Sequence, residues 1–92
     1  MVTVRAEPKG DGWSCIVEVD YSGRRTRHSV TVSRADLERW AEGGERDDVE
    51  SLVARSFDFL LEREPPDAIL ASFDLSSIQR YFPEYDRTFK RR

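Results

Sequence analysis

Cys15 and His28 are the only residue pair in this sequence that could perform nucleophilic chemistry, and each is the sole residue of its type. A thiol beside an imidazole can form the activated nucleophile of a cysteine enzyme. Apolar and polar residues alternate over 13–21 and again over 24–33, and pairing these segments around a two-residue turn would bring the two side chains onto one diagonal. A strand interior, however, buries a thiol as a small hydrophobic group and offers no oxyanion donors. The sequence therefore predicts a non-enzymatic protein with no catalytic residue.

The acidic residues show no pattern of a metal or cofactor site. A single cysteine cannot form a thiolate zinc cluster or an internal disulfide. The sequence contains neither a calcium-loop motif nor a His-Glu-x-x-His motif. Five aspartates occur where a helix is expected to begin, a position that favours an acidic side chain: Asp36, Asp47, Asp48, Asp67 and Asp74. We predict no metal ion, no cofactor and no small-molecule ligand.

Length and charge narrow the class of protein further. A chain of 92 residues is long enough for one domain with a modest core. Residues 35–83 carry twelve acidic and five basic side chains, whereas residues 1–34 and 84–92 each carry a net charge of +2. A general nucleic-acid-binding protein would show a larger and less interrupted positive field. With no secretory leader and no apolar run near 18 residues, the expected location is the cytoplasm, without membrane contact.

The N-terminal third, residues 1–33, has the pattern of a three-stranded antiparallel meander. Alternation over 1–7, 13–21 and 24–33 predicts three strands. With a turn at Ser22-Gly23, paired residue numbers in the second and third strands add up to 45. That register opposes Trp13 to Val32 on the apolar face, and on the other face it sets acidic residues of one strand against arginines of the next. A slip of one residue would lose both patterns, so we expect this register.

Residues 34–83 have the pattern of helices. Ser33 can cap a first helix that ends at Gly43-Gly44, and a long apolar stripe predicts a central helix over 48–64, capped by Asp47 or Asp48. Pro65-Pro66 should stop it. A short helix is expected after Asp67, another between Asp74 or Ser76 and Pro83, and then a tail over 84–92 that is frayed at its end. The predicted fold is a single α+β domain, residues 1–92, with a three-stranded meander packed against a helical half of three to four helices.

An interaction surface is the leading functional prediction. The apolar arc of the central helix covers roughly half of its circumference, more than one contact face requires. Aromatic residues also gather near the C-terminus, and aromatic side chains are enriched in interface cores. We therefore predict a protein-interaction or regulatory module, either a homo-oligomer or a small subunit of a larger complex. Its candidate interface residues are Phe59, Leu61, Tyr81, Tyr85 and Phe89. Burial of Phe59, Leu61, Tyr85 and Phe89 within one chain would remove the main support for this hypothesis.

A nucleic-acid-binding hairpin is the alternative prediction. Its candidate contacts are Arg24, Arg25, Arg27 and His28. Residues 13–42 resemble the three-strand-plus-helix DNA-binding modules of tyrosine integrases in three features: a tryptophan that opens a strand, a Gly-Arg-Arg hairpin tip and a helix that bears a tryptophan. The same sheet face carries Glu18 and Asp20, which repel phosphate. These acids can instead pair with the arginines across the strands, and the alternatives of phosphate binding and cross-strand pairing both stay open.

Overall fold

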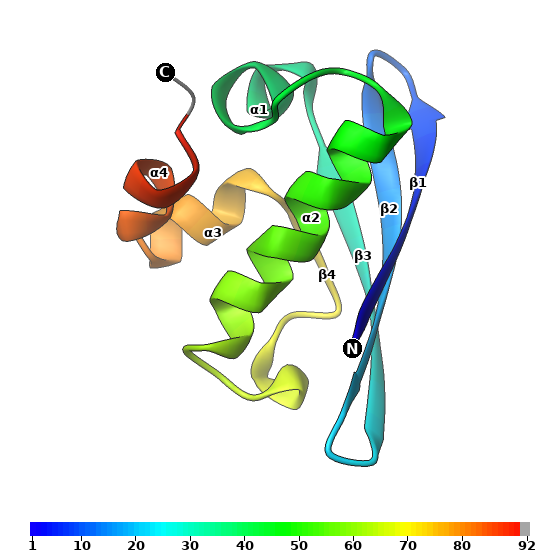
Figure 1. Ribbon diagram of the computed structural model, residues 1–92, viewed down its shortest axis with the longest axis vertical. Helices are drawn as coiled ribbons and strands as arrows, with labels where there is room; N and C mark the ends of the chain where they lie inside the picture. Colours follow the sequence, from blue (N-terminus) through cyan, green and yellow to red (C-terminus); the bar gives the residue numbers. More distant parts are fainter. Residues whose placement is uncertain (91–92) are drawn as a thin grey trace.

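The computed structural model describes residues 1–90, which form an α+β domain (Figure 1). This confirms the predicted fold class, with strands first and helices after them. The strands are β1 (Val2–Lys9), β2 (Gly12–Tyr21), β3 (Arg24–Val32) and β4 (Ser72–Asp74). The helices are α1 (Arg34–Trp40), α2 (Arg46–Leu61), the 3₁₀ turn η1 (Pro66–Ala68), α3 (Ser76–Tyr81) and α4 (Glu84–Phe89).

The predicted hairpin register is confirmed. Trp13 pairs with Val32, Glu18 with Arg27 and Asp20 with Arg25 in the β2–β3 ladder. Ser22 and Gly23 form the turn with φ angles of +54° and +78°. Two left-handed residues in a row suit the right-handed twist of the strands, and glycine adopts this conformation without steric cost.

A fourth strand replaces the short helix that the sequence predicts after Asp67. Pro66 opens a single 3₁₀ turn, and the chain then extends so that Phe73 pairs with Val30 in a parallel arrangement of β4 and β3. The prediction of a helix here is therefore wrong, whereas the predicted three-stranded meander is confirmed as β1–β3 and β4 is added to its edge. A short apolar run does not distinguish a strand from a helix, and in this case the free edge of β3 decides between them.

The helix starts follow the capping rules, with one shift. Ser33 caps α1, and its partner Asp36 completes a capping box as predicted. Helix α2 begins at Arg46, so Glu45 is its N-cap, and Asp48 accepts a hydrogen bond from the Glu45 N–H at 3.1 Å. Asp48 therefore occupies the third helical position, and the prediction that Asp47 or Asp48 is the cap residue is wrong.

The segment predicted as a C-terminal tail with a frayed end includes a helix. Residues 84–89 form α4, and residues 91–92 lie outside the described part of the chain. The ring of Tyr85 stacks on Phe89, with centroids 4.4 Å apart, and meets the edge of Trp40 at 5.0 Å. The Trp40 Nε1–H also donates a hydrogen bond to Asp86 at 2.9 Å. These contacts hold α4 against α1 and α2, because burial of two aromatic rings stabilises a helix too short to form alone.

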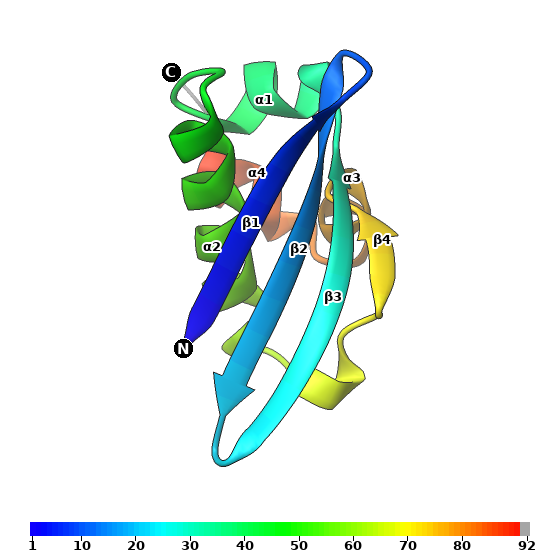
Figure 2. The ribbon, with the colours of Figure 1, turned by 90° about the vertical axis from the view of Figure 1, so that its right-hand side faces the viewer.

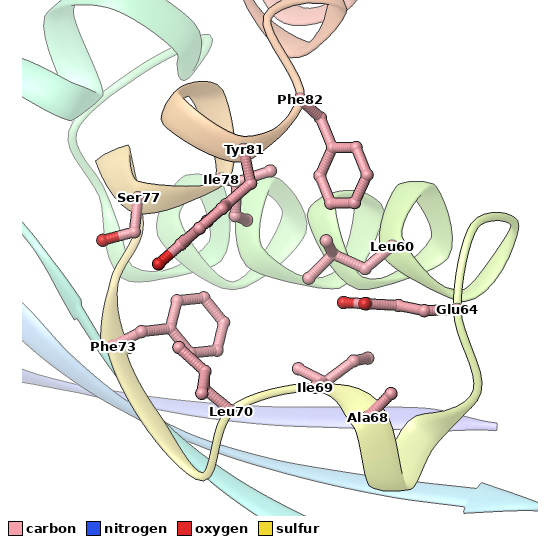
Figure 3. Close-up of a pocket in the computed structure, with 10 residues that line it drawn as sticks. All are labelled: Leu60, Glu64, Ala68, Ile69, Leu70, Phe73, Ser77, Ile78, Tyr81 and Phe82. Carbon is pink, nitrogen blue, oxygen red and sulfur yellow. The ribbon is translucent and has the colours of Figure 1, made fainter.

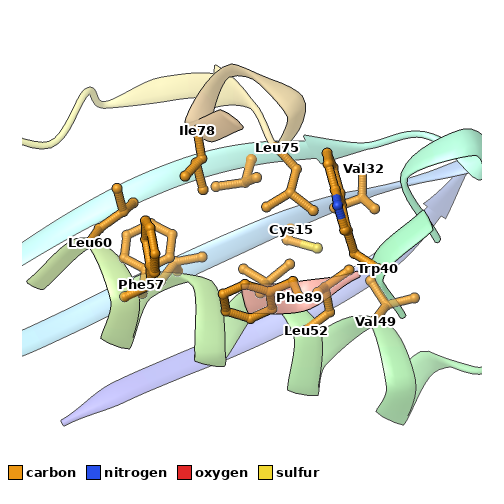
Figure 4. Close-up of a cluster of buried hydrophobic side chains, with 14 of the residues drawn as sticks. Cys15, Val32, Trp40, Val49, Leu52, Phe57, Leu60, Leu75, Ile78 and Phe89 are labelled. Atoms are coloured by element: carbon orange, nitrogen blue, oxygen red, sulfur yellow. The ribbon is translucent and has the colours of Figure 1, made fainter. Parts of the chain in front are cut away.

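All the helices lie on one face of the sheet, and the other face is open (Figures 1 and 2). The core lies between α2 and the inner sheet face, where Cys15, Val17 and Val30 are fully buried (Figure 4). Among residues 1–90, no helix is long and apolar enough to cross a membrane.

Candidate functional site

Cys15 and His28 do not form a catalytic dyad in this structure. The Nδ1 atom of His28 is 2.8 Å from the Leu70 carbonyl oxygen, and its Nε2 atom is 2.9 Å from the Thr26 hydroxyl. A carbonyl can only accept, so Nδ1–H donates to Leu70 and Nε2 accepts from Thr26. Both ring nitrogens therefore have hydrogen-bond partners other than the Cys15 thiol. His28 instead ties the segment before β4 to β3.

The thiol of Cys15 is expected to be unreactive in the folded protein. Burial raises its pKa to about 11, and the nearby Glu50 carboxylate adds to the effect. At pH 8 about one thiol in a thousand would then be ionised, and only the thiolate reacts quickly. A thiol-specific reagent such as the aromatic disulfide DTNB should therefore modify Cys15 only after denaturant is added. Rapid, stoichiometric modification of the native protein would contradict this expectation.

The basic residues of the hairpin are largely paired with acidic groups. Arg24 forms an ion pair with Asp67 of η1 at 3.0 Å, and Arg25 pairs with Asp20 at 3.5 Å. Arg27 is exposed and lies opposite Glu18 in the ladder, whereas His28 is buried. The four residues therefore do not form one exposed basic surface. The role of Arg24, Arg25 and Arg27 in nucleic-acid binding stays a prediction.

Three of the five predicted interface residues lie inside the protein. Phe59, Tyr85 and Phe89 are at most 8% exposed and form one aromatic cluster. Leu61 is half-buried, and only Tyr81 is largely exposed, at 72%. The aromatic C-terminus therefore contributes to the core, because α4 folds back onto α2. The part of the sequence support for an interface that rests on Phe59, Tyr85 and Phe89 is lost. Leu61 and Tyr81 keep exposed surface, and the interface stays a prediction.

A groove lies between β4 and α3 (Figure 3). Its volume is about 310 Å³. We call it the β4–α3 groove. Helix α2 provides the floor, η1 and the residues after it form one wall, and α3 forms the other. The lining residues are Leu60, Glu64, Ala68, Ile69, Leu70, Phe73, Ser77, Ile78, Tyr81 and Phe82.

The β4–α3 groove is apolar with few polar groups. Leu70 is 56% exposed and Tyr81 is 72% exposed, so two large hydrophobic side chains meet solvent at its rim. The polar groups that line it are the Glu64 carboxylate and the hydroxyls of Ser77 and Tyr81. Within residues 1–90, no cluster of three or more His, Cys, Asp or Glu side chains could hold a metal ion. The lining of the groove is therefore mostly apolar, with a single carboxylate.

No protein-family model, curated protein or solved structure matches this chain. The functional assignment therefore rests on the geometry of the β4–α3 groove.

Sequence reasoning missed most of this groove. The short helix predicted after Asp67 would have carried Ile69, Leu70 and Phe73. In the structure this stretch crosses from η1 to the sheet edge, so Leu70 is left at the surface. The Pro65-Pro66 pair restricts the backbone only of the residues that precede each proline, so it does not indicate that the chain is extended at Leu70 and Phe73.

Proposed function

We propose that this chain is a non-enzymatic protein-interaction module that binds a segment of another protein in the β4–α3 groove. The observation that carries this proposal is that two exposed hydrophobic side chains, Leu70 and Tyr81, lie at the rim of the groove. In the described chain, these are two of the four exposed large hydrophobic residues, along with Met1 and Tyr21. Exposed apolar side chains that rim a hollow are typical of sites where another molecule docks.

The size and the walls of the groove favour a peptide over a metabolite. A volume of about 310 Å³ is at the lower end of the range for small-molecule sites and has room for one or two large side chains. Its lining is mostly apolar and includes three polar side chains: Glu64, Ser77 and Tyr81. Leu70 and Tyr81 are exposed at the rim, so the groove is open, whereas a small-molecule site buries most of its ligand. Tyrosine at the rim is also a residue type enriched in interface hot spots.

Hydrogen bonds and an ion pair hold one groove wall in place before any partner arrives. The Leu70 carbonyl accepts from His28, and the adjacent Ala71 carbonyl accepts from the Ser29 N–H at 2.8 Å. The Arg24–Asp67 ion pair holds η1 against the hairpin. Preorganisation of this kind lowers the entropy that binding would otherwise lose.

Partner capture by matched variants tests the proposal. The tagged chain and the Leu70→Ser/Tyr81→Ser variant are incubated with lysate of the source cells, in one nuclease-treated half and one untreated half, and the stoichiometric partners are quantified. Loss of two rim contacts should weaken partner binding by about tenfold or more. Tyr21→Ser is the control, because Tyr21 is an exposed aromatic residue at the hairpin end, outside the groove lining.

The outcomes separate the candidate functions. A partner lost by the double variant and kept by the Tyr21→Ser control supports the groove. Equal capture by all three proteins removes the proposal. Binding that disappears with nuclease and with rising salt would indicate nucleic acid instead, since phosphate contacts depend steeply on salt.

A further inference from the structure

The two edges of the sheet differ in how their backbone groups are covered. At the β1 edge, the Ala6 N–H donates to Glu50 at 2.9 Å, and Arg46 donates to the Ala6 carbonyl at 3.0 Å. Pro8 of the same strand has no N–H to offer. Covering edge groups in this way prevents another strand from pairing there. The β1 edge is thus protected by side chains of α2.

The outer edge of β4 is open. The Ala71 carbonyl accepts from Ser29, and the Leu75 N–H donates to the Thr31 carbonyl at 2.9 Å. Since backbone groups alternate in direction along a strand, Ser72 and Asp74 direct their N–H and C=O groups away from β3. Both residues are exposed, and β4 is the last strand of the sheet (Figure 2).

A strand paired with this edge would send side chains over the β4–α3 groove. Side chains alternate between the two faces of a sheet, and directly opposite residues point the same way. Phe73 points into the helical layer and lines the groove (Figure 3). The residue opposite Phe73 would therefore point toward the groove, between Leu70 and Tyr81. Main-chain pairing combined with a pocket for alternate side chains is a known mode of peptide recognition.

The net negative charge of the segment that forms the groove favours a partner with basic side chains. Residues 58–84 carry six acidic and two basic side chains. Arg63 pairs with Glu62 and Glu84, and Asp67 pairs with Arg24. Glu64 forms no ion pair with any residue in the described part of the chain, and its carboxylate points into the groove (Figure 3). A lysine or arginine on the partner would supply the missing countercharge.

On this basis we infer that the β4–α3 groove binds an extended peptide segment of another protein, which adds to the free edge of β4 as a parallel or antiparallel strand. The inference rests on the proposed function, of which it specifies the partner. The segment places an apolar side chain between Leu70 and Tyr81 and a Lys or Arg two residues away, facing Glu64. Two residues is the spacing at which side chains of one strand share a face. Because β4 has only three residues, edge pairing is short and requires the groove contacts as well.

Selection from a randomised heptapeptide library displayed on phage tests this inference. The library is selected on the wild-type chain, and enriched peptides are synthesised and titrated by calorimetry. We expect the enriched sequences to contain an apolar residue and a basic residue two positions apart. Glu64→Gln should weaken their binding by about tenfold, and added salt should weaken it further. Asp58→Asn is the control, because Asp58 is an exposed acid of α2 outside the groove lining.

A proline at the edge tests strand addition. Ser72→Pro removes the outward N–H and leaves the β3–β4 hydrogen bonds in place, since proline is tolerated on an edge strand. We expect about tenfold weaker peptide binding by Ser72→Pro and unchanged binding by Ser72→Ala. Hydrogen exchange gives a second readout that needs no variant: the amides of Ser72 and Asp74 should exchange more slowly in the complex than in the free protein.

Each outcome bears on a different part of the inference. Enriched peptides that bind the Leu70→Ser/Tyr81→Ser variant equally well overturn the proposed function. If binding needs the rim residues but the amide exchange of Ser72 and Asp74 is unchanged in the complex, strand addition is overturned. Docking in the groove would then still stand. If the enriched peptides are acidic or neutral, or if no peptide is enriched, the inference that the bound segment is basic is overturned. Light scattering could instead show that the wild-type chain is a dimer and the rim variant a monomer. The occupant of the groove would then be a second copy of the chain, and the inference of a segment from another protein would be overturned.

Discussion

Replacing Tyr85 with alanine is expected to lower the free energy of unfolding by about 3–5 kcal/mol, the range for removal of a large buried aromatic ring. Tyr85 is fully buried, and its ring contacts Trp40, Phe59 and Phe89 within the aromatic cluster. Small domains are stable by about 5–15 kcal/mol, so this loss would bring the protein close to unfolding at ambient temperature. Urea unfolding followed by tryptophan fluorescence and by circular dichroism measures the change.

Two milder substitutions serve as controls for this prediction. Tyr85→Phe keeps the ring and removes only the hydroxyl, which lies 2.7 Å from the Ser56 hydroxyl. Ser56 keeps its hydrogen bond to the Leu52 carbonyl, so the cost should be about 1 kcal/mol. Arg87→Ala changes an exposed residue of the same helix and should alter stability by about 0.5 kcal/mol or less. Equal costs for alanine and phenylalanine at position 85 would show that α4 does not pack as described.

Burial also keeps the Tyr85 hydroxyl protonated. Loss of hydration raises the pKa of Tyr85 well above its ordinary value, although the hydrogen bond with Ser56 acts in the opposite direction. Because the folded-state pKa lies above the unfolded one, this group favours folding fully at neutral pH. Its contribution declines only in alkali, once the unfolded tyrosine begins to ionise. The Tyr85–Ser56 hydrogen bond is therefore a constant part of the core over the neutral range.

The features that the sequence predicts correctly are those that depend on neighbouring residues or on one local pairing. The β2–β3 register follows from two independent patterns, apolar residues on one face and opposite charges on the other. The Ser33–Asp36 capping box spans four residues and needs no other part of the chain. In both cases the interacting groups are close in sequence, so the residue types alone contain the information.

The features that the sequence does not predict depend on distant partners. Segment 72–74 is a strand because the edge of β3 is available, and the local apolar run is equally compatible with a helix. Segment 84–89 is a helix because Trp40 and Phe59 bury Tyr85. An aromatic-rich segment has the same composition in a core as in an interface, so the residue types could not place these rings.

The sequence does not predict the β4–α3 groove for the same reason. Its floor comes from α2 and its walls from η1, β4 and α3, and none of these elements is concave by itself. Only Tyr81 belonged to both the predicted interface and the observed rim. Tyr81 is the last residue of α3 and is exposed, although Ile78, three residues earlier, is buried.

Replacing Phe57 with alanine should have an effect as large as that at Tyr85, about 3–5 kcal/mol of lost stability. Phe57 is fully buried on α2, and its ring lies 5.2 Å from His28 and 6.0 Å from Phe73 by centroid distance. Phe57 therefore packs against both His28, which donates to the Leu70 carbonyl, and Phe73, which lines the groove. Thermal and urea unfolding measure the loss of stability.

The link from Phe57 to the groove calls for a milder variant that stays folded. Phe57→Leu should cost about 1–2 kcal/mol and also weaken binding of the groove-selected peptides, because a smaller side chain leaves space beneath Phe73. Val49→Ala is the matched control: Val49 is fully buried near the start of α2, away from the groove lining, and its truncation should cost about 2 kcal/mol. If the core beneath Phe73 shapes the groove, only Phe57→Leu lowers peptide affinity at equal stability loss. Equal loss of affinity in both variants would mean that the groove responds to stability in general, and that Phe57 has no particular role in its shape.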